Sequence, residues 1–156
     1  MSEAAQQRRK MLIRTGVMLG VFAGLHGCST PPPPPRKSVT AFPLSNAKTE
    51  REYRVDVARH LYQRNAQRIY SGKLPPLLYA IGVTRLHVSP QGEVLDVDWM
   101  RRPKHAPEVI AEIERTIREA APLPVAPALH HLYYTDTWLW HASGRFQLDT
   151  LTEGQA

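Results

Sequence analysis

The sequence predicts an α+β fold, a two-layer sandwich in which helices pack on an antiparallel sheet. Three observations predict it. Residues 49–72 and 108–121 have apolar side chains at helical spacing, residues 83–99 form two alternating runs around a Pro/Gly turn, and residues 135–151 alternate again near the end. The expected order is therefore helix, strand, strand, helix, strand, with a short final strand folding back.

The first helix is expected to begin at Thr49, because Thr49 and Glu52 form a capping-box pattern. Apolar residues then recur every three or four positions, and Gly72 suits the C-terminal cap. Arginines between the apolar positions are interpreted as a solvated face, with contact to anionic lipid headgroups as the alternative. These arginines are Arg51, Arg54, Arg59, Arg64 and Arg68.

A β-hairpin is expected next, with its turn at residues 89–93. Alternation places one set of side chains towards the core and the other outward. The inward set is Leu86, Val88, Leu95, Val97 and Trp99, and the outward set is Arg85, His87, Asp96 and Asp98. We interpret the two aspartates as cross-strand partners of the arginine rather than as an acid–base pair.

The second helix is expected to have Pro107 in its first turn and to end at the Pro-Leu-Pro of residues 122–124. Its apolar positions form a stripe that suits packing on a sheet. Residues 135–140, a tight turn at 141–144 and residues 145–151 then predict a strand, a turn and a second strand.

The N-terminus has the layout of an export signal. Basic residues at 8–10 and Arg14 precede an apolar run over residues 16–25, and Cys28 follows. The segment around Cys28 resembles the lipobox of bacterial lipoproteins, which implies a signal peptide at 1–27 and lipid attachment at Cys28. An uncleaved signal anchor over residues 11–25 is the alternative, although about fifteen residues is short for a membrane span. Arg8 and Arg9 form a pair typical of a twin-arginine signal, so the export route can be either the general or the twin-arginine one.

Residues 28–48 are predicted to be a linker, and residues 49–156 the folded domain. The five consecutive prolines at 31–35 favour a stiff polyproline spacer of roughly 16 Å. We expect the protein at the periplasmic face of a bacterial membrane, attached through its N-terminal lipid. Because Ser29 rather than Asp follows the cysteine, the outer membrane is favoured over the inner one.

Composition excludes several other functions. The chain has 20 basic and 14 acidic side chains, but four of the basic ones lie in the leader, and no nucleic-acid motif accompanies the rest. The single cysteine excludes an internal disulfide. His130, His131 and His141 are not expected to bind a metal, since adjacent residues on a strand face opposite sides. No phosphate loop or nucleophile motif is present, so we expect neither an enzyme nor a cofactor.

Residues 77–151 resemble the C-terminal domain of TonB, the periplasmic end of the energy transducer that serves outer-membrane receptors. The likeness is carried by the hairpin at 83–99 with Gly92 in its turn, the helix at 108–118 with its proline-rich exit at 120–124, and the ending at 137–148. The leading helix at 49–71 is more like that of the related TolA domain.

The resemblance implies binding of a partner by strand addition, in which an extended segment of an outer-membrane receptor or other periplasmic protein pairs with an exposed sheet edge. Residues 135–140 are the candidate edge. The expected partner contacts are Thr137, Trp138, Leu139, Trp140, Phe146 and Leu148. In the alternative interpretation, the two tryptophans cover the core beneath the helices.

The chain also departs from the family. A cleaved and acylated start removes the membrane helix through which the family's transducers engage their motor, and the proline run is short. The expected function is therefore a lipid-anchored binding module rather than an energy transducer. The alternative is a structural lipoprotein that self-associates through its edge strand, as a homodimer.

Overall fold

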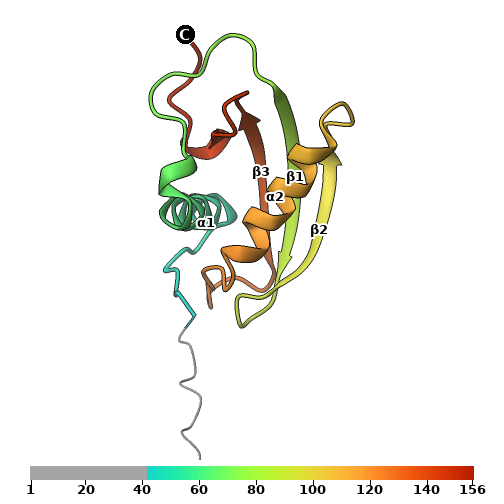
Figure 1. Cartoon of the computed structure of the whole chain (residues 1–156). Helices are drawn as coiled ribbons and strands as arrows, with labels where there is room; N and C mark the ends of the chain where they lie inside the picture. Colours follow the sequence, from blue (N-terminus) through green and yellow to red (C-terminus); the bar gives the residue numbers. More distant parts are fainter. Residues whose placement is uncertain (1–41) are drawn as a thin grey trace, which may run out of the picture. The chain divides into compact units, whose positions relative to one another are not determined.

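The computed structural model describes residues 42–156, and these confirm the α+β fold and the predicted order of elements (Figure 1). The helices are α1 (Glu50–Arg64) and α2 (Pro107–Glu119). The strands are β1 (Ala80–Val88), β2 (Val94–Arg101), β3 (Leu132–Trp140) and β4 (Phe146–Leu148), and short 3-10 turns are η1 (Ala66–Arg68) and η2 (Asp149–Leu151). The strands form one antiparallel sheet in the order β2-β1-β3-β4. The predicted signal peptide and Cys28 lie outside the described residues.

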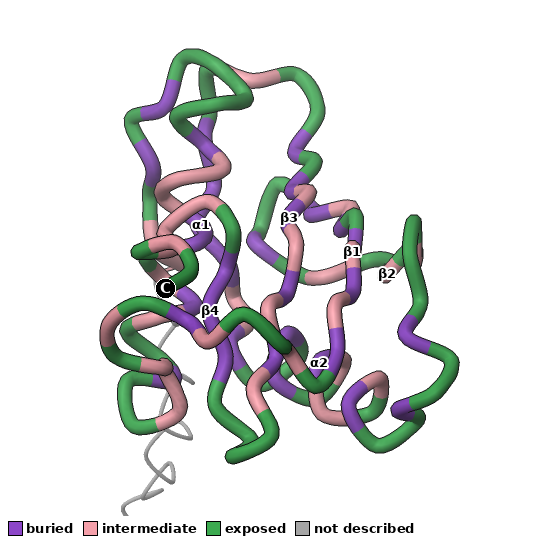
Figure 2. Tube along the Cα trace, turned by 90° about the horizontal axis from the view of Figure 1, so that it is seen from above, coloured by how far each residue is buried: buried purple, intermediate pink, exposed green. Residues whose placement is uncertain are grey.

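One face of the sheet packs against both helices and the other does not. Even-numbered residues of β1 and β3, such as Leu86, Tyr134 and Trp138, are buried beneath α1 and α2. Odd-numbered residues of the same strands are half-buried or exposed on the opposite face, and the alternation is visible along both strands in Figure 2. The described residues 42–156 lie in one compact unit, so this part of the chain has a core of its own.

The start of α1 is as predicted, but its end is not. Thr49 and Glu52 form both bonds of the capping box. The helix ends at Arg64 rather than near Gly72, because the side chain of Asn65 turns back to donate to the carbonyl of Leu61 and a 3-10 turn follows. The chain then runs beside β4, where the N–H of Tyr70 donates to the carbonyl of Phe146.

The folded domain begins before Thr49. Ser45 N donates to the carbonyl of Val125, and Val125 N donates to that of Pro43. The Ser45 hydroxyl also donates to Asp56 on α1, and Ala47 is buried. Residues 43–48, which the sequence assigned to the linker, are therefore part of the domain.

The hairpin turn is bound to the segment that follows α2. Gly92 has a φ of +82°, and a Cβ at this position would clash with the carbonyl oxygen of Leu123. Leu123 N in turn donates to the carbonyl of Gly92 at 2.8 Å. Leu95, predicted to face the core, is exposed because the register of β2 shifts beside it. Arg85 lies opposite Asp98 in the ladder, but Asp96 lies opposite His87, and within residues 42–156 Arg85 forms no ion pair with either aspartate.

Candidate binding edge

β3 is not an edge strand, so the prediction that residues 135–140 form the free edge is wrong for the part that pairs with β4. β1 runs along all nine residues of β3. β4 is short and pairs only with Trp138–Trp140. Within residues 42–156, no strand pairs with the remaining side of residues 132–137. We call this unpaired side of residues 132–137 the half-edge.

Every second residue of the half-edge directs its backbone groups away from β1. Successive residues of an antiparallel strand direct N–H and C=O alternately to their two sides. His141 N donates to the carbonyl just before β4, so odd-numbered residues of β3 face the β4 side. Thr137 fits this assignment, because its backbone N–H donates to the carboxylate of Asp136 and not to a group on β1. Tyr133 and Thr135 therefore present backbone N–H and C=O groups that no group in residues 42–156 satisfies.

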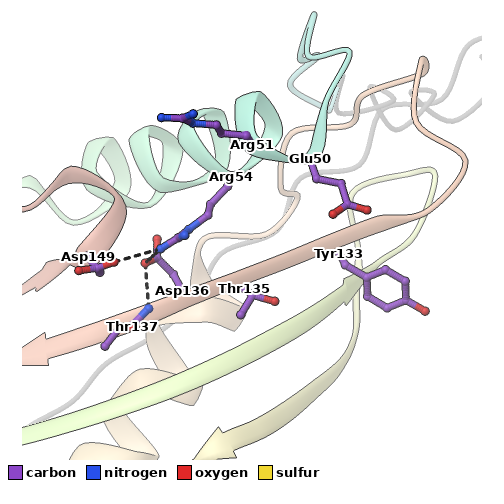
Figure 3. Close-up of a pocket in the computed structure, with 8 residues that line it drawn as sticks. All are labelled: Glu50, Arg51, Arg54, Tyr133, Thr135, Asp136, Thr137 and Asp149. Carbon is purple, nitrogen blue, oxygen red and sulfur yellow. Dashed lines mark hydrogen bonds and ion pairs between the residues drawn. The ribbon is translucent and has the colours of Figure 1, made fainter.

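A cavity of about 440 Å³ lies between the half-edge, the first turns of α1 and η2 (Figure 3). Figure 3 shows Arg54 extending from α1 to the sheet and Glu50 pointing from the start of α1 towards β3. The cavity is lined by Glu50, Arg51, Arg54, Tyr133, Thr135, Asp136, Thr137 and Asp149. An extended segment that entered this space would meet backbone groups on one side and charged side chains on the other.

Asp136 organises the floor of the cavity. Its carboxylate is buried and accepts four hydrogen bonds: from Arg54 Nη2 at 3.0 Å, from Thr137 N at 2.8 Å, from Thr150 N at 3.2 Å and from the hydroxyl of Tyr134 at 2.8 Å. These donors come from α1, β3 and η2. One carboxylate thus joins the helix, the strand and the segment after β4.

The electrostatics of this cluster keep its donors protonated. Burial lowers the pKa of Arg54, but its bond to Asp136 and the charges of Asp136 and Asp149 outweigh that effect, and the net shift is upward. Burial, followed by the charge of Asp136, raises the pKa of Tyr134 well above its usual value. Arg54 therefore stays charged, and Tyr134 stays a hydrogen-bond donor to Asp136.

The same cluster ends β4 and so creates the half-edge. Beyond Leu148 the chain turns into η2 instead of continuing along β3. The carboxylate of Asp136 accepts a hydrogen bond from the N–H of Thr150, and Arg54 Nη2 forms an ion pair with Asp149 Oδ2 at 3.3 Å. Without this turn, residues 149–153 would run antiparallel beside residues 133–137 in the register of β4. The cavity occupies the place of that missing strand.

The predicted contact residues fall into two groups. Trp138, Trp140, Phe146 and Leu148 are buried in the domain's own core, so their assignment as partner contacts is corrected and the alternative interpretation of the tryptophans holds. The indole N–H of Trp138 donates to Thr84, and the ring of Trp140 stacks on Phe146. Thr137 and Leu139 lie half-buried on the uncovered face of the sheet.

Sequence reasoning missed Tyr133, which lies outside the expected edge at residues 135–140. Thr135 and Asp136 lie within that edge but were not among the expected partner contacts. A signal for Asp136 was present, because it occupies the same alternating face as Tyr134 and Trp138, where a charge must be paired. Nothing in the local sequence marks Tyr133 and Thr135, since their open backbone groups result from the length of β4.

Other candidate sites gain no support from the described residues. Residues 42–156 contain no group of three His, Cys, Asp or Glu side chains placed to bind a metal ion. Within the same range, none of the helices has the length and apolar character needed to span a bilayer.

Two of the arginines predicted to form a solvated face instead form ion pairs. Arg54 pairs with Asp136, and Arg68 pairs with Glu112.

Comparison with known proteins found no matching family model, no similar curated protein and no similar solved structure. The resemblance to the TonB C-terminal domain therefore stays a prediction from the residues quoted above.

Proposed function

We propose that this domain binds an extended segment of a partner protein by strand addition at the half-edge of β3. The observation that carries the proposal is the pair of unsatisfied backbone positions, Tyr133 and Thr135, beside a cavity of about 440 Å³. An incoming strand would satisfy these groups and extend the row that β4 begins. The proposed partner is an outer-membrane receptor segment or another periplasmic segment, as the sequence resemblance implies.

The other open edge, on β2, is less suited to a partner strand. β2 is unpaired on its outer side within residues 42–156, but its ladder with β1 has an irregularity near each end. Asp96 and Asp98 also stand on this strand, and a second copy paired antiparallel about its middle would bring like charges together. These features are typical of protected edges, and they disfavour the homodimer that the sequence left as an alternative.

We expect Thr135→Pro to weaken strand addition strongly and Thr135→Val to preserve it. Proline removes the N–H that points into the cavity, while the ladder to β1 uses other residues, so the fold should persist. The probe is a peptide selected on residues 42–156 from a display library of random dodecapeptides. Titration calorimetry should show at least a roughly tenfold loss of affinity for the proline variant and little change for the valine variant. Exchange of the Tyr133 amide should slow in the complex.

Three results would contradict strand addition at this site. The first is equal binding by the proline and valine variants, once circular dichroism has shown both to be folded. The second is a bound peptide that leaves the exchange of the Tyr133 amide unchanged. The third is a tight dimer of residues 42–156 in sedimentation with no peptide selected, which would favour self-association.

We further propose that the domain is held at the periplasmic face of a membrane, preferably the outer one, by a lipid on Cys28. The leader and the single cysteine support this proposal. Radiolabelled palmitate should enter the wild-type protein but not Cys28→Ala, and fractionation should move the variant out of the outer membrane. Label that persists in the variant would contradict lipidation at Cys28.

A further inference from the structure

A basic surface lies at the end of the sheet where β1 begins and β2 ends. The last residue of β2 and the loop that follows it supply Arg101, Arg102, Lys104 and His105 within five positions, all exposed. Together with residues 78–81 they line a cavity of about 240 Å³ that has no acidic side chain in its lining. We call this surface the basic end.

Two cations of the basic end have no ion-pair partner among residues 42–156. Arg102 lies 3.7 Å from Glu114 and over the ring of Trp99, so its charge is partly neutralised. In the described part of the chain, neither Arg101 nor Lys104 forms an ion pair with a carboxylate. The basic end therefore presents at least two uncompensated positive charges to the surroundings.

Apolar side chains stand beside these charges. Leu77 is 88% exposed, the most exposed large hydrophobic residue in the described chain, and Tyr79 is also exposed. Leu78 and Tyr79 line the same cavity as Arg101 and Lys104. Leu77 directly precedes Leu78 in the chain, and an exposed leucine on the same segment as a cation-lined cavity is a combination that lets a surface insert into the interface of an anionic bilayer.

The basic end is far from the point where the chain enters the domain. Leu44 pairs with Val125, which lines a pocket at the Val88 end of β1, whereas Leu78 and Tyr79 lie at its Ala80 end. Figure 1 likewise shows the chain entering at the opposite end of the sheet from the loop before β1. The nine residues of β1 separate the two ends by roughly 25–30 Å. The fourteen Cα–Cα steps from Cys28 to Phe42 span at most about 50 Å, enough for the domain to turn back to a membrane.

We propose that the basic end is a membrane-docking surface that binds anionic phospholipid, with Arg101 and Lys104 meeting headgroup phosphates and Leu77 entering the interface. The surface shares no lining residue with the half-edge cavity. Docking therefore does not depend on the peptide-binding or lipidation proposals, and the domain alone suffices to test it.

The test is co-sedimentation of residues 42–156 with vesicles of equal parts phosphatidylcholine and phosphatidylglycerol. We expect binding that weakens with added salt and is absent on pure phosphatidylcholine. The double variant Arg101→Glu and Lys104→Glu should bind at least about 25-fold more weakly, since each cation near an anionic surface contributes about fivefold. Leu77→Ser should bind the vesicles about tenfold more weakly, because it removes the inserted apolar side chain.

The matched control is Arg59→Glu with Arg64→Glu on α1, which changes the net charge equally at exposed positions. Retained binding by this control, together with the two losses, would support docking at the basic end. Equal loss by the control would overturn the proposal and favour a non-specific charge effect or the arginine face of α1. Leu77→Ser binding as tightly as wild type would also overturn it, since a purely ionic site would accept any polyanion.

Discussion

Replacing Asp136 by alanine is expected to lower the free energy of unfolding by about 3–5 kcal/mol. The carboxylate is buried and serves four donors from three elements, so its removal leaves Tyr134, Thr137 and Thr150 with unsatisfied groups. Arg54 loses its buried partner in the same step. Urea unfolding of residues 42–156, followed by circular dichroism, measures the change.

Asp149→Ala is the matched control, because both carboxylates bind the same atom of Arg54. The Asp149 side chain is 56% exposed, whereas that of Asp136 is fully buried. An exposed pair contributes little, so the control should lose less than about 1 kcal/mol. If the two variants lost similar stability, the charge of Arg54 rather than the buried carboxylate would be the source of the effect.

The elements that depend on short-range signals could be predicted from the sequence. The capping box of Thr49 and Glu52 marks the start of α1, Pro107 marks that of α2, and the turn around Gly92 joins the hairpin. Alternation also predicted that Trp138 and Trp140 share one face. Each of these signals is contained within a few residues, which is why local reasoning suffices for them.

The errors concern contacts between distant segments. α1 stops at Arg64 partly because residues 69–70 pair with Phe146, a partner far along the chain. The half-edge exists because β4 ends after three residues, and that end depends on the contact of Arg54 on α1 with Asp136 on β3. No local pattern reports how long a pairing strand will be. The sequence therefore predicted the position of β3, but four of the six expected contacts, Trp138, Trp140, Phe146 and Leu148, are core residues.

Trp138→Ala is expected to cost about 3–5 kcal/mol of folding stability, because Trp138 is among the largest fully buried side chains. It contacts Phe146 at 5.1 Å between ring centroids, and its indole N–H donates to Thr84 at 2.9 Å. Trp138→Phe keeps most of the ring volume but loses this hydrogen bond, so a smaller loss of about 1–2 kcal/mol is expected. Urea unfolding measures both variants.

Leu139→Ala is the control for Trp138, since Leu139 is the next residue of β3 and faces the uncovered side of the sheet. The free energy of unfolding of Leu139→Ala should fall by only about 1 kcal/mol. Because Trp138 lies in the core, Trp138→Phe should keep its affinity for the selected peptide, apart from any unfolded fraction. A folded Trp138→Phe protein that has lost peptide binding would return Trp138 to the contact surface, and would place the partner strand on the helical face of β3 rather than at the half-edge.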